Sequence, residues 1–285
     1  MILIADGGST KCDWILLDLK GEVALKTRTQ GLNPAVVKSE LLIERLQAND
    51  ELMKIANDVT KIFFYGAGCG TDKPNLALKK IFEAIFKNAE VDVKEDTYAA
   101  TYAVTSEPGI VCILGTGSNS SYFDGEEVHT TIPSLGYTLM DEASGNYFGK
   151  KLIRDYFYKK MPEDLRKEFE QKFDLSADSI KENIYKKDNP NVYLANFAEF
   201  MFRAERNDYF YSVLKKGMKD FFKNRIKPYD NYQELPVHFV GSIAFFSSDI
   251  INKVARKYGV TIGNIVRRPI DGLIEYHRKQ LEIVK

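Results

Sequence analysis

Residues 6–10 of the chain (Asp-Gly-Gly-Ser-Thr) combine side chains and backbone that can hold an anion. Two adjacent glycines leave their backbone N–H groups without a neighbouring Cβ, so several of these groups can turn toward one point. The hydroxyl groups of Ser9 and Thr10 add donors, and the carboxylate of Asp6 suits a hydrated cation beside a phosphate. An ordinary β-hairpin with a Gly-Gly turn would carry the same residues, so this loop alone does not decide between structure and binding.

A second stretch of the chain repeats this pattern. Each copy begins with an apolar run that predicts a buried strand, at residues 2–4 and 110–114. Each continues with a loop of small residues (6–10 and 115–118), a second strand, and a tight turn into a third strand. Because internal repeats indicate duplicated structural units, we expect two related lobes whose loops bind one polyphosphate from both sides.

The rest of the chain predicts alternating helices and strands. In the first half we expect strands at 23–29, 61–65 and 91–93 and helices at 36–47, 50–57, 75–87 and 97–105. In the second half we expect a mainly helical stretch (150–226), strands near 237–240 and 265–267, and a closing helix at 269–283. This order argues for mixed sheets with helices on their faces. Aromatic residues crowd the stretch 192–222, which we interpret as core or as a contact in a homodimer.

Composition and charge narrow the class of protein. The chain has 285 residues, 44% hydrophobic and 28% charged, which suits a globular protein of about two domains. Basic and acidic residues balance at 40 each, so net charge gives no case for nucleic acid or an anionic membrane. No apolar run approaches the roughly 20 residues that span a bilayer, and we expect no signal peptide. The three cysteines (Cys12, Cys69 and Cys112) lie far apart in the sequence, and we expect them to be reduced thiols in the cytoplasm. Their spacing does not indicate a metal site of the His/Cys type.

Asp96 lies where a predicted strand ends and a predicted helix begins. It could serve as the N-cap of that helix. It could equally accept a proton from an attacking hydroxyl group, because the carboxyl ends of parallel strands face the ligand crevice in open α/β sheets. Glu95 is the rival carboxylate for this role.

Two further motifs have both a structural and a functional interpretation. Residues 66–70 (Gly-Ala-Gly-Cys-Gly), with Asp92 beyond them, match a dinucleotide-binding loop weakly and a tight crossover close to a ligand equally well. Residues 140–145 (Met-Asp-Glu-Ala-Ser-Gly) are expected to open a helix, whose dipole favours acids in its first turn, while Asp141 could bind sugar hydroxyl groups. The chain has no G-x-x-x-x-G-K-[ST] motif, so a P-loop does not hold any nucleotide.

Taken in order, these motifs resemble the acetate and sugar kinase/Hsc70/actin superfamily. Residues 6–10 are similar to its first phosphate loop, residues 115–118 to its second, and residues 241–244 (Gly-Ser-Ile-Ala) to its adenosine motif. Within it, the chain looks most similar to the N-acetylglucosamine kinase branch of the BadF/BadG/BcrA/BcrD ATPase family. The motifs shared with that branch are 31–34 (Gly-Leu-Asn-Pro), 115–119 (Gly-Thr-Gly-Ser-Asn) and 141–145 (Asp-Glu-Ala-Ser-Gly). Many relatives have Gly-Gly where this chain has Gly241-Ser242, so the nucleotide preference stays open.

The resemblance implies an α/β fold of two ribonuclease H-like (actin-like ATPase) lobes with a cleft between them. The first lobe would cover residues 1–107. The second would cover residues 108–285 and be enlarged by helices, and its last helix could pack back on the first lobe.

The resemblance also implies ATP and Mg²⁺ as cofactors and a small-molecule amino sugar, such as N-acetylglucosamine, as substrate. Asp6 would position Mg²⁺ through water, and Asp96 would take the proton from the acceptor hydroxyl on C6. The residues expected to bind the nucleotide and its phosphates are Gly7, Gly8, Ser9, Thr10, Lys11, Gly115, Thr116, Gly117, Ser118, Gly241 and Ser242. The residues expected to bind the sugar are Asn33, Gly68, Asn119 and Asp141. Closure of the lobes would exclude water and limit idle hydrolysis.

Two other functions stay open on the sequence. An ATPase activator of a dehydratase or reductase, known in the same family, would share an iron–sulfur cluster between two subunits and need closely placed cysteines. A sugar-responsive regulator without catalysis is the second alternative, although this chain lacks the DNA-binding and zinc motifs of related regulators. The identity of the amino sugar is also open, because one or two side chains can discriminate among such substrates.

Overall fold

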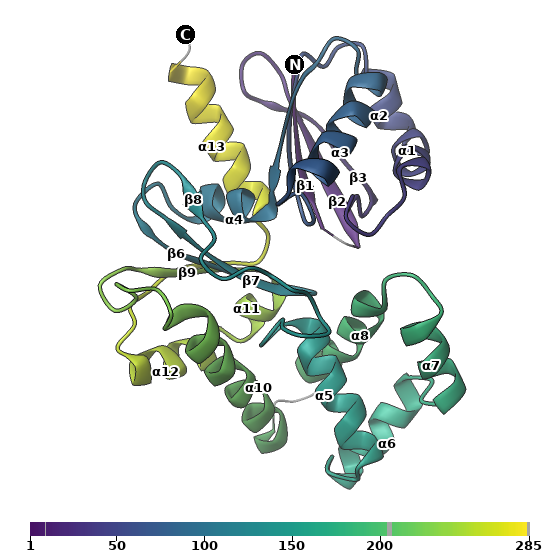
Figure 1. Cartoon of the computed structure of the whole chain (residues 1–285), viewed down its shortest axis with the longest axis vertical. Helices are drawn as coiled ribbons and strands as arrows, with labels where there is room; N and C mark the ends of the chain where they lie inside the picture. The colour runs from purple at the N-terminus through teal and green to yellow at the C-terminus, as the bar shows by residue number, and fades with distance from the viewer. Residues whose placement is uncertain (9, 204–206, 284–285) are drawn as a thin grey trace. The chain divides into compact units, whose positions relative to one another are not determined.

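The computed structural model describes residues 1–8, 10–203 and 207–283. The chain divides into two compact units (Figure 1). Unit 1 consists of Met1–Ala103 together with Pro269–Lys285, and unit 2 is the continuous segment Val104–Arg268. The closing helix therefore belongs with the N-terminal part of the chain.

Unit 1 is built on a mixed sheet of five strands in the order β3-β2-β1-β4-β5. Its strands are β1 (Ile2–Gly7), β2 (Lys11–Leu17), β3 (Val23–Gln30), β4 (Lys61–Gly66) and β5 (Glu90–Glu95). The first three form an antiparallel meander, and β4 and β5 extend the sheet in parallel from β1. The expected turn at 6–10 is shorter in the structure, since Asp6 and Gly7 continue β1.

Helices cover both faces of this sheet because successive residues of β1 point to opposite sides. Leu3 and Ala5 belong to the core under α1 (Ser39–Gln47), α2 (Asp50–Ile55) and α3 (Asp72–Ile85). Ile4 belongs to a second cluster formed with α4 (Asp96–Val104) and α13 (Ile270–Ile283). The helix expected at 75–87 begins earlier, at Asp72, because proline is compatible with the first turn of a helix.

Unit 2 repeats the connectivity of unit 1. Its sheet has the order β10-β9-β6-β7-β8, in which β6 has the place of β1. Its strands are β6 (Gly109–Leu114), β7 (Ser118–Phe123), β8 (Val128–His129), β9 (Val237–Val240) and β10 (Ile262–Val266). Again the first three strands are antiparallel and the last two continue in parallel from the first. The duplicated fold expected from the sequence is confirmed.

The helices of unit 2 enclose an aromatic core. They are α5 (Gly145–Phe157), α6 (Glu163–Lys172), α7 (Ala177–Tyr185), α8 (Pro190–Ala198), α9 (Phe200–Arg203), α10 (Asp208–Phe221), the π-helix η1 (Phe222–Ile226), α11 (Ser242–Phe246) and α12 (Ser248–Tyr258). Phe197, Phe200, Phe210, Phe221 and Phe222 are buried in one cluster with residues of β6 and β9. The core interpretation of the aromatic stretch is therefore confirmed for these rings.

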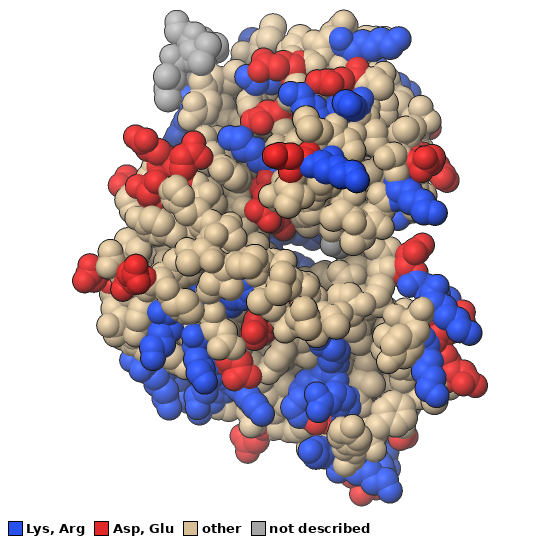
Figure 2. Space-filling model, in the orientation of Figure 1, with Lys and Arg blue, Asp and Glu red and all other residues tan. Residues whose placement is uncertain are grey.

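Charged side chains of both signs occupy the face shown in Figure 2. Within the described residues, no helix is long and apolar enough to cross a membrane.

Candidate active site

The first predicted phosphate loop joins β1 to β2 in unit 1. The Gly8 N–H donates to the Lys11 carbonyl at 2.8 Å and closes the turn. The Gly7 and Thr10 carbonyls accept from the N–H groups of Ala67 and Gly31, at 2.8 and 3.0 Å. The loop is therefore anchored on both sides by backbone. Ser9, also predicted to bind phosphate, lies outside the described residues.

Asp6, near the end of β1, has one negative and one positive side chain as electrostatic neighbours, Asp13 and Lys11. It is opposite Asp13 in the antiparallel register. Burial, followed by the charge of Asp13, raises the pKa of Asp6 to about 7, and Lys11 partly counteracts these effects. Asp13 itself is held by Lys11 Nζ at 3.2 Å and by Arg28 Nε at 2.5 Å. Asp6 is thus the carboxylate of this pair without a strong cationic partner among the described residues.

Asp96 is the first residue of α4 and directly follows β5. Burial, followed by the charges of Glu95 and Asp6, raises its pKa to about 7, and a backbone hydrogen bond from Thr97 partly counteracts these effects. The structure therefore brings Asp96 and Asp6 close enough to oppose each other's ionisation. A carboxylate with a pKa near 7 is well matched to a general base at neutral pH, since about half of it is ionised and the ionised form is basic enough to accept a proton.

Glu95 is oriented differently from Asp96. Its Oε2 accepts from the Thr97 hydroxyl at 3.3 Å, and burial raises its pKa. Its carboxyl group also lies against the Gly70 backbone, because a Cβ placed on that glycine would be 2.8 Å from Glu95 Oε1. Burial, followed by the charges of Asp96 and Glu95, raises the pKa of the Cys69 thiol to about 12, so Cys69 is neutral here.

Asn33 and Gly68, both predicted to bind sugar, lie together in unit 1. The Asn33 Oδ1 accepts from the Ala35 N–H at 3.0 Å. Gly68 has φ +80°, and a Cβ there would lie 2.0 Å from Asn33 Oδ1. Only glycine fits this approach, which explains part of the 66–70 glycine pattern without a dinucleotide.

The second predicted phosphate loop is tied to the start of α5 in unit 2. The Gly115 carbonyl accepts from the Gly145 N–H at 2.8 Å. The Thr116 carbonyl accepts from both the N–H and Nδ2 of Asn146, at 3.0 and 2.8 Å. The first N–H groups of a helix have no partner within the helix, so this loop supplies their acceptors.

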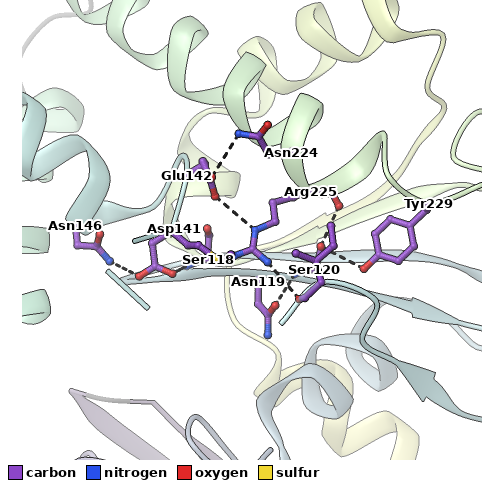
Figure 3. Close-up of polar contacts among 11 residues, drawn as sticks. Ser118, Asn119, Ser120, Asp141, Glu142, Asn146, Asn224, Arg225 and Tyr229 are labelled. Carbon is purple, nitrogen blue, oxygen red and sulfur yellow. Dashed lines mark hydrogen bonds and ion pairs between the residues drawn. The ribbon is translucent and has the colours of Figure 1, made fainter. Parts of the chain in front are cut away.

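Asp141 holds the same loop through its side chain. Its Oδ1 accepts from the Ser118 N–H at 3.2 Å, and its Oδ2 accepts from Asn146 Nδ2 at 2.7 Å (Figure 3). A carboxylate offers about four lone-pair sites, so these bonds leave capacity for a ligand. The five residues Gly115, Thr116, Gly117, Ser118 and Asp141, each predicted from the sequence, are thus brought together.

The helix expected to open at residue 140 does not begin there. Ser144 is the N-cap of α5, which starts at Gly145, so Asp141 and Glu142 precede the helix. Asp141 and Ala143 have φ of +71° and +57°. Left-handed backbone costs roughly 1–3 kcal/mol for a residue with a side chain and persists only where neighbouring contacts impose it. The expectation failed because hydrogen bonds to the 115–118 loop outweigh the local preference for helix.

The predicted adenosine motif lies beside this loop. Gly241 follows β9 with φ +121°, and a Cβ there would be 2.2 Å from the Leu114 carbonyl oxygen and 3.2 Å from the Gly115 nitrogen. Ser242 is exposed at the start of α11. Asn119 is buried in β7, where its Oδ1 accepts from the Ser120 N–H at 2.9 Å. Its position in the strand places it on the opposite face from Ser118 and Ser120.

Solved structures share this fold over nearly the full chain. A candidate N-acetylglucosamine kinase from Porphyromonas gingivalis is 34% identical, with 98% of this chain and 99% of that chain covered at a TM-score of 0.91. The chain belongs to the sugar kinase family. It is an ATP-dependent kinase of the sugar kinase/Hsc70/actin superfamily.

Other structures resemble this sugar kinase in fold alone. A candidate N-acetylglucosamine kinase from Chromobacterium violaceum is 14% identical at a TM-score of 0.69, covering 96% of this chain and 98% of its own. A ROK family glucokinase from Streptomyces griseus, in complex with glucose and AMPPNP, is 16% identical at a TM-score of 0.59. The match covers 96% of this chain and 97% of that chain. No family model and no curated protein matches the sequence.

The structure of the sugar kinase also reveals residues that the sequence did not single out. Asn146 donates to both Thr116 and Asp141. An asparagine in a first helical turn, five residues after a candidate ligand, was a signal that could have found it. Arg225 lies beside Glu142 with a side chain only 1% exposed. A basic residue in the sequence Phe-Phe-Lys-Asn-Arg gives no sign that it is buried.

Proposed function

We propose that the chain transfers the terminal phosphoryl group of ATP to the C6 hydroxyl of an amino sugar of the N-acetylglucosamine class. The observation that carries the chemistry is Asp96, a carboxylate with a pKa of about 7 at the junction of β5 and α4. The likeness to a candidate N-acetylglucosamine kinase at 34% identity supports the substrate class. We further place the chain in the N-acetylglucosamine kinase branch of the BadF/BadG/BcrA/BcrD ATPase family, as its motifs suggest.

In this proposal Asp96 accepts the proton of the sugar hydroxyl as its oxygen bonds to the terminal phosphorus. The bond from that phosphorus to the bridging oxygen breaks, and ADP leaves with the electron pair. The transition state of phosphoryl transfer is loose, so positioning and charge stabilisation contribute most of the rate. Proton removal by a placed base adds about 10²–10⁴-fold.

The residues around Asp6 fit a magnesium ion. Mg²⁺ prefers carboxylate and phosphate oxygens and keeps several of its waters. The raised pKa values of Asp6 and Asp96 would fall beside a divalent cation, which favours the ionised forms of both carboxyl groups. In the described part of the chain, no three His, Cys, Asp or Glu residues form a metal cage of their own. We therefore propose that Asp6 holds Mg²⁺ through water and that the ion neutralises phosphate charge.

The remaining predicted roles are proposals of the same kind. Phosphates would bind donors of the two loops, including Gly8, Lys11 and Gly117, and the nucleotide would lie against Gly241. The sugar would contact Asn33 and Gly68 in unit 1, and Asn119 and Asp141 in unit 2. We propose a cytoplasmic location, because the enzyme would use ATP and its three cysteines are free and buried.

A screen of sugar-dependent ADP release tests this proposal. Purified protein is assayed with ATP and Mg²⁺ against N-acetylglucosamine, glucosamine, N-acetylmuramic acid and neutral hexoses, with a sugar-free control. We expect turnover with one amino sugar, loss of turnover with EDTA, and a product whose ³¹P–¹H correlation lies at C6. A preference for a neutral hexose would overturn the substrate class. Sugar binding without turnover would indicate a regulator, and a brown, oxygen-sensitive protein would indicate the dehydratase activator.

A further inference from the structure

Arg225 is a buried cation on a π-helical turn. It belongs to η1, which directly continues α10, and it is 1% exposed. Single π-helical turns are rare and frequently mark functional positions. A buried charge is tolerated only where partners compensate for the lost water. The contacts of this guanidinium therefore indicate what it is placed to hold.

All three donor nitrogens of Arg225 reach the segment 130–144, which joins β8 to α5. Nε lies 3.5 Å from Glu142 Oε2 (Figure 3). Nη1 donates to the Ile132 carbonyl at 3.3 Å, and Nη2 lies 3.1 Å from Met140 Sδ. The neighbouring Asn224 donates through Nδ2 to the other oxygen of Glu142 at 3.4 Å. One side chain thus connects both ends of a segment that has no helix or strand.

The partner of Arg225 is placed at the most strained point of this segment. Glu142 stands between Asp141 and Ala143, the two residues with left-handed backbone. Such conformations persist only where surrounding contacts impose them. Asp141 in turn accepts from the Ser118 N–H, so its position fixes the start of β7. The contacts therefore run from Arg225 through Glu142 to the loop at 115–118.

The π-helix also contacts β7 directly. The Ser120 hydroxyl donates to the Arg225 carbonyl at 2.9 Å, and just after the π-helix the Tyr229 hydroxyl donates to Ser120 Oγ at 3.3 Å. Ser120 follows Asn119, which is buried in the same strand. The turn thus holds β7 through its backbone and the segment 130–144 through its guanidinium.

We infer that Arg225 is a positioning residue that, paired with Glu142, sets the geometry of Asp141 and of the 115–118 loop for ligand binding. This inference rests on the proposed function, in which Asp141 contacts sugar and the loop contacts phosphate. Arg225 does not touch either substrate in this role. Its effect falls on binding by unit 2 and leaves the proton transfer at Asp96 intact.

Substitutions at both ends of the pair test the inference by steady-state kinetics. Arg225→Met keeps the volume and removes the guanidinium, whereas Arg225→Lys keeps the charge without the planar fork. Glu142→Gln weakens the partner. We expect Arg225→Met and Glu142→Gln each to raise the KM for sugar about tenfold and to change kcat less than about threefold, the pattern of lost binding interactions. The double variant should be no worse than the stronger single variant, because the two residues act as a unit.

A matched control and a second measurement separate positioning from general loss of stability. Tyr229→Phe removes one hydrogen bond to β7 from a residue just after the π-helix, and should leave both kinetic constants within about twofold. Hydrogen exchange followed by mass spectrometry, without ligand, should show faster exchange in peptides covering 115–123 and 130–145 for Arg225→Met but not for Tyr229→Phe.

Three results would overturn the inference. They are a lowered melting temperature with unchanged KM in the variants that fold, additive effects in the double variant, or unchanged exchange in both peptides. Absence of sugar turnover in the unmodified protein would instead refute the proposed function, and the exchange data would still decide whether Arg225 sets the loop. If Arg225→Met does not fold, Arg225→Lys and Glu142→Gln carry the same comparison.

Discussion

The two units share one strand order and use their carboxylates in opposite ways. In unit 1, burial together with the charges of neighbouring carboxylates raises the pKa of both Asp6 and Asp96 to about 7. In unit 2, both oxygens of Asp141 accept hydrogen bonds from the protein. The same sheet topology therefore carries carboxylates with raised pKa values in one copy and a hydrogen-bonded clamp in the other.

This difference indicates which unit carries the reactive groups and which unit fixes a conformation. Carboxylates without a cationic partner are costly to bury, so they persist where a proton, a cation or a ligand compensates for the lost water. Carboxylates bonded to backbone and amide groups instead fix a conformation. We therefore expect substitutions in unit 1 to change the reaction with little loss of stability. Substitutions in unit 2 should change both the reaction and the stability.

The largest expected effect is on turnover in Asp96→Asn. Removing the proposed base should lower kcat by about 10³-fold and leave nucleotide affinity within about threefold, since the amide retains the shape of the side chain. Steady-state rates and calorimetric titration with ADP measure these quantities. Glu95→Gln is the matched control and should keep kcat within about tenfold. If Glu95→Gln has the larger effect, or if ADP affinity collapses in Asp96→Asn, the base is assigned wrongly.

A glycine comparison in unit 2 should give the largest change in stability. Gly241→Ala forces a Cβ against the Leu114 carbonyl at a left-handed position, which should cost about 2–4 kcal/mol of unfolding free energy. A Cβ at Gly115 meets nothing within 4 Å. Gly115→Ala should therefore cost less than about 1 kcal/mol, while weakening nucleotide binding if the loop contacts phosphate. Urea denaturation and ADP titration of both variants make the test, and equal stability losses would contradict it.

Asp141→Asn tests the clamp in unit 2. The amide can accept only on one side, so either the Ser118 N–H or Asn146 Nδ2 would face another donor. We expect a loss of about 1–3 kcal/mol in unfolding free energy, because a buried donor is left without a partner. Asp230→Asn, at an exposed position between η1 and β9, is the control and should change stability by less than about 0.5 kcal/mol. Similar losses in both variants would show that Asp141 is not a clamp.

The smallest expected effect is on the pH dependence of stability. The raised pKa values of Asp6 and Asp96 mean that the folded state binds more protons than the unfolded chain between pH 3.8 and about 7. Stability contributed by these groups therefore falls as pH rises through that range. Asp96→Asn should be more stable than the unmodified protein by about 1–2 kcal/mol at pH 8 and equally stable near pH 4. Urea midpoints at both pH values measure this difference, and a stabilisation that does not change with pH would exclude the proposed repulsion.

Much of the fold could be predicted from short-range patterns. Apolar runs followed by small-residue loops identified β1 and β6, and the strand–helix junction placed Asp96 at the end of β5. Such features depend on neighbours along the chain. The start of α5 could not be predicted in this way, because Asp141 is held out of the helix by Ser118, 23 residues earlier.

Arg225 shows the same limit more strongly. Its burial depends on Glu142, 83 residues earlier, and on Ile132, 93 residues earlier. Nothing in its local sequence separates it from the exposed lysines beside it. Long-range partners of polar residues therefore account for what the sequence did not reveal, since only folding defines them.

The division of the chain has a consequence for its synthesis. Unit 2 is continuous, whereas one face of the unit 1 sheet is completed by α13, which is translated after all of unit 2. Domains commonly fold as they emerge from the ribosome. Here Ile4, Ile15 and Leu17 stay uncovered by Leu273 and Ile274 until the ribosome has passed residue 268. This face of β1 is thus completed only after unit 2 has been made, and a nascent chain stalled before α13 would present these apolar side chains to chaperones.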